Sequence, residues 1–411
     1  MNHLKAAVYA NERGRVWLLV LGIYLMAANL RAPLTAVGPI VGQIRDDTGI
    51  TNTVAGMLTT LPLLAFALLS PIAPKISRRF GIEQTLFFSA LLLFTGILLR
   101  AFHPVWMLFL GTAMLGFAIA LGNVLIPSLI KRDFPLKVGL MTGVYSMSMN
   151  MWAAIASGVS IPIAESFSLG WRGSLTFWAG LSLIALLVWI PQLAGGKKDA
   201  GAPANSPAVR RGGSLWRSPL AWKVTLFMGL QSLVFYVGIT WIPQILQYIG
   251  VSPSASGWLL FLMQIFSVPG SFLAPVLAGR SSDQRMLVAV TTGLMFTGYA
   301  GLLMGNTVLL PLWMICIGIS LGSAFSLAVM FFALRTRTTH EAAELSGMAQ
   351  SIGYLLAAFG PTFFGFIRDV TQGWTTPILI VLLVSVTLMI VGWSTGKNVY
   401  VSSAEEKNVA S

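Results

Sequence analysis

The sequence has little charge, almost no cysteine and few acidic or histidine residues. Among 411 residues there are one cysteine, three histidines and 13 Asp or Glu. A single Cys316 excludes a disulfide framework and a thiolate metal cluster. His3, His103 and His340 fall in a tail and in loops, so we predict no metal site. No catalytic carboxylate pair, triad or nucleotide-binding glycine loop occurs, and we therefore predict neither an enzyme nor a cofactor.

Apolar residues make up what is left: 56% of the chain is hydrophobic and only 9% is charged. This composition is typical of an integral membrane protein. Apolar windows of about 20 residues, each long enough to cross a bilayer as a helix, recur about twelve times. They start near residues 16, 52, 83, 105, 138, 173, 220, 254, 285, 308, 342 and 375. We predict an all-α membrane protein with about twelve transmembrane helices.

The net charge of +13 does not indicate nucleic-acid binding, because the basic residues lie in short loops between apolar windows. Alternate loops carry 21 of the 26 Lys and Arg. The remaining loops carry only Arg45, Arg100, Arg172 and Arg368. Loops rich in Lys and Arg stay in the cytoplasm. This pattern predicts a multi-pass protein in a lipid bilayer with both termini cytoplasmic.

The longest polar segment covers residues 195–218 and is rich in Gly, Ala, Pro, Ser and basic residues, which predicts a flexible cytoplasmic linker. It separates two predicted six-helix bundles, residues 1–194 and 219–411. The two parts repeat weakly at a constant offset of 204 residues, as Lys131 with Arg335 and Thr142 with Ser346 illustrate. Parallel repeats of this kind are typical of transporters that rock about a central site between pseudo-symmetric bundles.

Arg31 is the unusual residue, because it lies midway along an apolar segment bounded by Arg15 and Arg45. A helix places it roughly 24 Å beyond Arg15, deep in the bilayer. A charge there costs about 2.5 kcal/mol or more, and arginine stays protonated. No acidic residue falls at the same depth, so a negative or electron-rich substrate could supply the partner. Alternatively, carbonyls freed at Pro33 and Pro39, or an aromatic ring, hold the guanidinium.

Further polar residues fall at mid-helix depth. Each faces a cavity or bonds a neighbouring helix, since an amide facing lipid is costly. The offset of 204 takes Arg31 to Phe235, next to Tyr236, which predicts an asymmetric site with charge from one bundle and aromatic groups from the other. Besides Arg31, the predicted substrate-binding residues are Thr35, Asn123, Tyr145, Gln231, Tyr236, Gln264, Gln350 and Tyr354.

Charged residues near the helix ends are candidates for gating or coupling. Proton-driven pumps usually carry acidic or histidine side chains within the membrane. Here only Glu165 and Glu344 come close, so a proton relay would use them, water or the substrate, whereas a uniporter or anion exchanger needs no such group. The gating or coupling residues predicted are Lys75, Arg78, Arg79, Asp133, Glu165, Asp283 and Glu344.

Residues 74–81 resemble the signature that follows the second helix of the major facilitator superfamily, Gly-x-Leu-Ala-Asp-Arg-x-Gly. The basic residue and the last glycine fit, but Pro74 and Arg78 replace the first glycine and the aspartate, so the gate's acid would come from Asp133 or Asp283. Residues 59–67, 120–125, 129–135, 216–222 and 345–354 are more specifically similar to the cyanate permease and 2-nitroimidazole transporter family. That resemblance implies transport of small anions or small polar aromatic compounds across the bacterial inner membrane.

The sequence therefore predicts a monomeric secondary or facilitative transporter for a small anion or small, polar, electron-rich solute, working by alternating access. Arg31 would bind the negative end of that small-molecule substrate. A broad-specificity drug exporter with a structural Arg31 is the first alternative. A membrane receptor that binds without translocating is the second, and the lack of a sizeable soluble output domain counts against it.

Overall fold

The computed structural model describes residues 2–50, 52–166, 170–195 and 215–401, and the regular structure of these residues is entirely helical. The N-terminal half contains α1 (Asn2–Thr35), α2 (Val37–Thr48), α3 (Asn52–Leu69), α4 (Ala73–Phe80), α5 (Ile82–Leu99), α6 (Trp106–Asp133), α7 (Val138–Ser166) and α8 (Gly170–Gly195). The C-terminal half contains η1 (Leu215–Arg217), α9 (Pro219–Tyr248), α10 (Pro253–Arg280), α11 (Arg285–Leu303), η2 (Thr307–Leu309), α12 (Leu310–Leu334), α13 (Thr339–Thr371) and α14 (Thr375–Thr395). Most of the predicted linker lies outside the described residues.

Within the described part of the chain, eleven helices are long and apolar enough to cross a membrane. The count rises to twelve if the bent pair Met57–Leu69 and Ala73–Phe80, which meet at 61°, forms one broken span. The prediction of about twelve transmembrane helices is thus confirmed. The apolar windows of the sequence find them because each window is long enough to cross the bilayer and its interior backbone groups are paired within its own helix.

Local sequence signals set where several helices begin. Ser218 and Ser252 cap α9 and α10, and each is followed by a proline at the first helical position. Thr338 and Glu341 form a reciprocal capping box at the start of α13. These side chains satisfy amide groups that have no partner within the helix.

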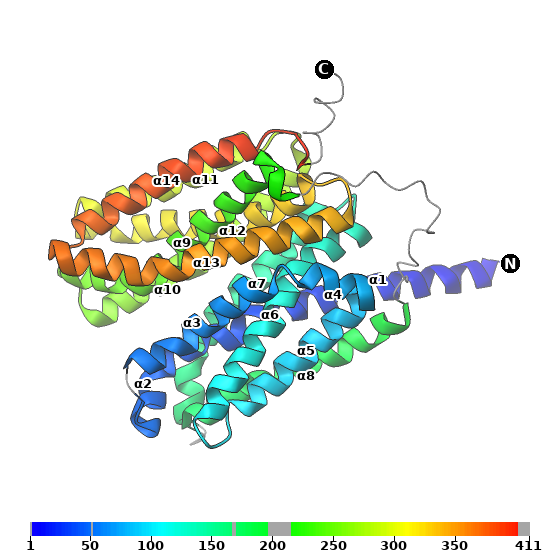
Figure 1. The fold of residues 1–411 in the computed structure, drawn as a ribbon, viewed down its shortest axis with the longest axis horizontal. Coiled ribbons are helices and arrows are strands. Elements are labelled where there is room, and N and C mark those ends of the chain that lie inside the picture. The colour runs from blue at the N-terminus through cyan, green and yellow to red at the C-terminus, as the bar shows by residue number, and fades with distance from the viewer. Residues whose placement is uncertain (1, 51, 167–169, 196–214, 402–411) are drawn as a thin grey trace.

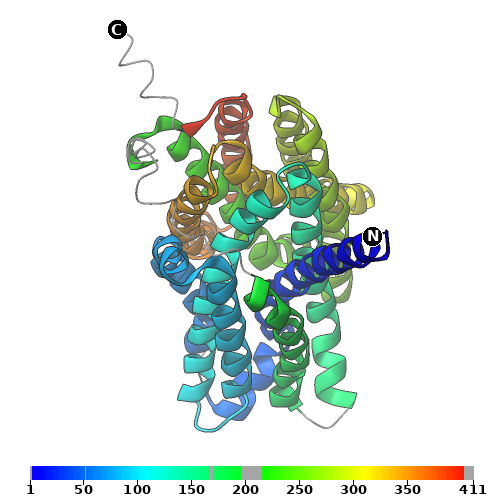
Figure 2. The ribbon, with the colours of Figure 1, turned by 90° about the vertical axis from the view of Figure 1, so that its right-hand side faces the viewer.

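The helices gather into two groups (Figures 1 and 2). In the N-terminal half, α1 packs on α7 and α8, and α5 packs on α6 and α8. In the C-terminal half, α10 packs on α12, and α9 packs on α13 and α14. Contacts of α7 with α10, and of α3 and α6 with α13, join the two groups. The interface between the groups is therefore formed in part by α3, α6, α7, α10 and α13.

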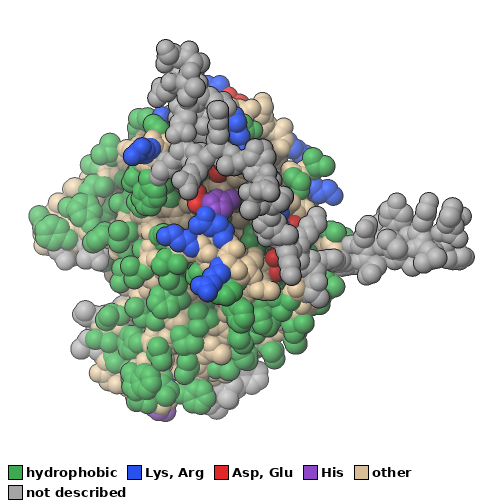
Figure 3. Space-filling view, turned by 45° about the vertical axis from the view of Figure 1, so that its right-hand side comes forward, with side chains coloured by type: hydrophobic (Ala, Val, Ile, Leu, Met, Phe, Trp, Pro, Cys, Tyr) green, Lys and Arg blue, Asp and Glu red, His purple; other side chains and the backbone are tan. Residues whose placement is uncertain are grey.

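We name the two ends of the molecule by short helices. The α2 end carries α2 and the turn between α9 and α10, and the α4 end carries α4 and the turn between α12 and α13 (Figure 1). Figure 3 shows Lys and Arg side chains gathered with a histidine toward the α4 end, while hydrophobic side chains cover the flanks. The Lys and Arg side chains that Figure 3 draws in blue thus gather toward one end, as the sequence pattern indicates.

Candidate functional site

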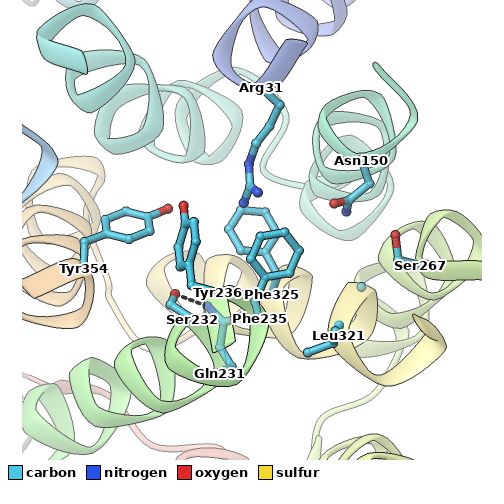
Figure 4. Close-up of a pocket in the computed structure, with 11 residues that line it drawn as sticks. Arg31, Asn150, Gln231, Ser232, Phe235, Tyr236, Ser267, Leu321, Phe325 and Tyr354 are labelled. Carbon is cyan, nitrogen blue, oxygen red and sulfur yellow. Dashed lines mark hydrogen bonds between the residues drawn. The ribbon is translucent and has the colours of Figure 1, made fainter. Parts of the chain in front are cut away.

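Arg31 points from α1 toward two rings of the C-terminal half (Figure 4). Its guanidinium carbon lies 5.0 Å from the centre of the Phe235 ring and 5.1 Å from that of Phe325. The residue is 8% exposed. No carboxylate of the described residues lies within ion-pair distance of it. Two cation–π contacts stabilise the charge partly, each by about 0.5–2 kcal/mol, and leave the N–H donors of the guanidinium available.

A cavity of about 660 Å³, here called the central cavity, reaches from Arg31 toward the α2 end. On α1 it is lined by residues that follow Arg31, and on α9 by residues that follow Phe235. On α3 it is lined by residues between 58 and 66, and on α10 by residues between 260 and 267. Polar lining side chains are Thr35, Thr59, Thr60, Asn150, Ser157, Tyr236, Thr240, Gln264 and Ser267. Arg31 is the charged side chain among the described lining residues, so the cavity carries a single positive charge.

A second space, here called the narrow pocket, continues past Arg31 between α9, α12 and α13. Arg31, Asn150, Tyr236 and Ser267 line both spaces. Gln231 and Tyr354 line only the narrow pocket, where Figure 4 shows the hydroxyls of Tyr236 and Tyr354 directed toward each other. The Gln231 amide donates to the hydroxyl of Ser232 at 2.7 Å. Arg31 therefore lies at the boundary between the wide and the narrow space.

Thr35 fixes the backbone near Arg31. Its hydroxyl donates to the carbonyl of Ala153 on α7 at 3.2 Å and back to the carbonyl of Arg31 at 3.2 Å. Ser and Thr in helices often bond the preceding turn in this way. The Thr35 side chain also lines the central cavity.

Three predicted binding residues lie away from both spaces and bond one another. Tyr145 donates to the side-chain oxygen of Asn123 at 3.1 Å, and Gln350 donates to the backbone carbonyl of Asn123 at 2.8 Å. All three are buried. In this conformation Gln350 joins α13 to α6 across the halves and Tyr145 joins α7 to α6, and their contact with substrate stays a prediction.

The α4 end is closed by contacts between the halves. The Lys131 ammonium donates to the carbonyl of Ala333 at 2.9 Å and to the hydroxyl of Thr336 at 2.7 Å, and it also bonds the Thr336 carbonyl. Ser351 donates to the carbonyl of Ala67. At Gly139, an added Cβ would lie 2.4 Å from the carbonyl oxygen of Pro275, so only glycine allows α7 and α10 this close.

The predicted gating residues divide into cross-half and local contacts. Arg78 contacts His340 at 2.8 Å and lies 4.0 Å from Glu344, so this cluster joins α4 to α13. Asp133 pairs with Arg132, and Asp283 pairs with Arg285, each within its own half. Hydrogen bonds from Arg285 lower the pKa of Asp283. In this conformation the acid that pairs across the halves is therefore Glu344 rather than Asp133 or Asp283.

The remaining gating residues have looser surroundings. Arg79 lies 5.4 Å from the ring of its neighbour Phe80, and Lys75 is exposed at the same end. Glu165 is exposed near the end of α7, about two helical turns beyond Ser157, which lines the central cavity. Their part in gating or coupling remains a prediction.

Sequence reasoning did not single out Phe325 or Ser267, which complete the surroundings of Arg31. Phe325 is 7% exposed within the mostly apolar α12, and nothing in its neighbouring residues distinguishes it from other packed phenylalanines. Its role follows only from the packing of α12 beside α9 and α7. Apart from Thr35, the threonines and serines of the cavity wall were not predicted for the same reason, since each is one of many hydroxyl residues in the helices.

Comparison with known proteins decides the family. Residues 16–361 match the family model of the Major Facilitator Superfamily. The chain belongs to this superfamily. It is 41% identical to the 2-nitroimidazole transporter of Escherichia coli (strain K12) over 92% of this chain and 95% of that protein. It is 28% identical to the Cyanate transport protein CynX of the same organism, over 91% and 96%.

A solved structure agrees with the fold. The proton:xylose symporter XylE has a TM-score of 0.76 with this chain at 14% identity, covering 95% of this chain and 98% of that one. The predicted fold and the predicted resemblance to the cyanate permease and 2-nitroimidazole transporter family are confirmed. The protein is a multi-pass membrane transporter of the Major Facilitator Superfamily with a small-molecule substrate, and it is not an enzyme.

Proposed function

We propose that this transporter moves a small anion, or a small polar and electron-rich organic solute, by alternating access of the central cavity to the two sides of the inner membrane. Arg31 binds the negative or electron-rich end of the solute. The observation that carries the proposal is the unpaired charge of Arg31 at the inner limit of the cavity, with no acid in the described lining. A bound anion supplies the counter-charge that the protein does not.

The chemistry of the surrounding groups fits a small flat solute. Arg31 offers a planar fork of donors, which suits carboxylate or nitro oxygens. The amide of Asn150 and the hydroxyl of Tyr236 line the same two spaces and can hydrogen-bond a second polar edge. Phe235 and Phe325 offer aromatic faces beside the guanidinium. The two relatives named for cyanate and 2-nitroimidazole transport are consistent with this class of solute.

The conformation supports alternating access. The cavity reaches toward the α2 end, and hydrogen bonds between the halves close the α4 end. Because the α4 end carries the basic loops, we assign it to the cytoplasm, with both termini on that side. The structure then represents an outward-facing state, and a rocking motion of the halves would break the α4-end contacts while closing the cavity.

A broad-specificity exporter is the second candidate, because apolar residues such as Leu34, Leu63, Phe66 and Ile239 form part of the cavity wall. A volume of about 660 Å³ also falls within the range of drug-sized binding sites. In that case Arg31 would be dispensable for most substrates. If deletion of the gene removes drug resistance and leaves anion flux unchanged, the exporter is favoured.

The decisive experiment measures uptake of labelled cyanate and 2-nitroimidazole into proteoliposomes for the parent and for Arg31→Ala. We expect uptake by the variant to fall to background while its expression and melting temperature stay near the parental values. Arg280→Ala is the matched control, because it removes an exposed charge at the end of α10. Uptake by Arg31→Ala at the parental rate would refute the role of Arg31.

A further inference from the structure

Arg100 is a second buried cation, and it lies outside both the central cavity and the narrow pocket. It follows the last residue of α5 and is 1% exposed. Burial lowers the pKa of its guanidinium to about 10, which leaves it charged at neutral pH. A buried charge is retained at a considerable energetic cost, so its contacts need an explanation.

The side chain of Arg100 ends on the backbone of α1. Its Nη1 donates to the carbonyl oxygen of Pro33 at 2.9 Å, while Nε and Nη2 have no partner among the described residues. The guanidinium therefore makes one directed hydrogen bond. That bond connects α5 to the segment that begins two residues after Arg31.

The Pro33 carbonyl lies in the last turn of α1, just before the break between α1 and α2. α1 ends at Thr35 and α2 begins at Val37, with Ala36 between them as a joint. The last four carbonyls of a helix have no amide partner within the helix. The Ala36 amide donates to the Ala32 carbonyl at 3.0 Å, and Arg100 donates to the carbonyl of the next residue, Pro33.

The joint between α1 and α2 is held from two sides. From α7, the carbonyl of Ala153 accepts from the Thr35 hydroxyl at 3.2 Å, and the Ser157 hydroxyl donates to the Thr35 carbonyl at 3.5 Å. From α5, Arg100 holds Pro33. Thr35 and the residues after the joint, Gly38 and Pro39, line the central cavity. The position of the joint therefore sets one wall of the cavity.

The Arg100 side chain can reach α1 because residue 111 of α6 is a glycine. A Cβ added at Gly111 of α6 would lie 2.8 Å from the Cγ of Arg100 and 2.5 Å from the carbonyl oxygen of Gly96. Neither contact is compatible with an ordinary side chain. The absence of a side chain at Gly111 thus allows both the close approach of α5 and α6 and the position of the Arg100 side chain.

We propose that Arg100 is a positioning residue for substrate binding: its hydrogen bond to Pro33 fixes the α1–α2 joint and, through it, the place of Arg31 in the cavity. The inference rests on the proposed function. Without this bond, the last turn of α1 is held from α7 alone and can shift, and Arg31 loses its alignment with Phe235 and Phe325. Binding is then weaker, whereas the fold and the rate of the loaded carrier change little.

The test compares Arg100→Met with Arg100→Lys in proteoliposomes, measuring KM and maximal rate for labelled cyanate and 2-nitroimidazole. We expect Arg100→Met to raise KM by about tenfold, equal to roughly 1.4 kcal/mol, with a maximal rate within about twofold of the parent. Arg100→Lys keeps a donor for Pro33 and should restore most of the affinity. A parental KM in Arg100→Met, or a loss confined to the maximal rate in both variants, overturns the proposal.

A backbone substitution decides the matter if Arg100→Met fails to reach the membrane. Replacing Leu34 by its α-hydroxy acid turns the Pro33–Leu34 amide into an ester and weakens the Pro33 carbonyl as an acceptor. The same replacement at Leu30 is the control, because it weakens the carbonyl of Asn29. That carbonyl has no amide donor within the helix, since the residue four positions later is Pro33, which has no N–H. We expect only the ester at Leu34 to raise KM, and equal KM values for the two esters would contradict the inference.

The outcomes separate this inference from the proposed function. If Arg31→Ala is inactive while the Arg100 and Leu34 variants keep the parental KM, only the positioning role fails. If Arg31→Ala transports at the parental rate, the proposed function fails, whatever the Arg100 variants do.

Discussion

Removing the ammonium of Lys131 should loosen the closed α4 end. Lys131 comes from the last turn of α6 and donates to two carbonyls and one hydroxyl at the end of α12, those of Ala333 and Thr336. A cation suits this place, because the carbonyls at the C-terminus of a helix carry partial negative charge. All three bonds join the N-terminal half to the C-terminal half, so they exist only while the α4 end is closed.

The expected size of the effect follows from these contacts. A hydrogen bond to a charged group contributes about 1.5–3 kcal/mol, and bonds made by one side chain are not additive. We therefore assign the whole contact about 2 kcal/mol, allowing for water that replaces the ammonium in Lys131→Ala. At 1.4 kcal/mol for each factor of ten, the population of the closed state falls roughly 30-fold relative to that of the state in which the halves are apart at this end.

A single-cysteine reporter measures that shift. The sole cysteine, Cys316, is replaced by serine, and Ser70→Cys is added at the end of α3. Ser70 is fully buried, and its backbone contacts Gly347 of the other half closely. A thiol there reacts with a maleimide only when the α4 end opens. We expect Lys131→Ala to raise the labelling rate about 30-fold if the closed state predominates in the parent.

Lys137→Ala provides the control, since Lys137 is exposed at the same end and its side chain makes no bond to the rest of the described structure. Its labelling rate should match that of the parent. An unchanged rate in Lys131→Ala, with normal folding by gel filtration and melting temperature, would show that the Lys131 contacts do not hold the closed state.

Two further predictions concern other contacts. Gly139→Leu should raise the labelling rate of Ser70→Cys as well, because any side chain at this position meets the Pro275 carbonyl and pushes α7 from α10; an unchanged rate would mean that the helices adjust locally. Hydrogen bonds from Trp171 and Arg172 lower the pKa of Asp47 below 3.8, so its contribution to stability is present above pH 3.8 and is lost as pH falls through the lowered value. Asp47→Asn should therefore lower the melting temperature slightly at pH 6, with the difference from the parent vanishing well below pH 3.8; a difference that persists there would contradict this origin.

The helices were predictable because the bilayer imposes a length and a composition on each span separately. Every apolar window satisfies its own backbone hydrogen bonds, so its existence does not depend on its neighbours. Arg31 was predictable for the same reason, since a charge in the middle of such a window is conspicuous against its surroundings. The family resemblance predicted a transporter of the Major Facilitator Superfamily, and the comparisons confirmed this prediction.

The surroundings of Arg31 could not be predicted in the same way. The sequence left open whether a substrate or an aromatic ring meets the guanidinium, and the structure shows rings from α9 and α12 on one side and a cavity on the other. Asn123, Gln350 and Tyr145 had the same polarity as the cavity residues, yet Tyr145 bonds Asn123 within the N-terminal half and Gln350 bonds Asn123 across the halves. Only the packing of distant helices separates these two uses of an amide or a phenol.

Composition and periodicity thus determined the spans, the basic end and the one deeply placed arginine, because each depends on a single segment and its solvent. The tertiary structure alone decided which end is closed, which hydroxyls line the cavity and that Arg100 bonds the backbone beside Arg31. Those features depend on contacts between segments up to 284 residues apart, as between Ser351 and Ala67, and no local pattern in the chain encodes such distances.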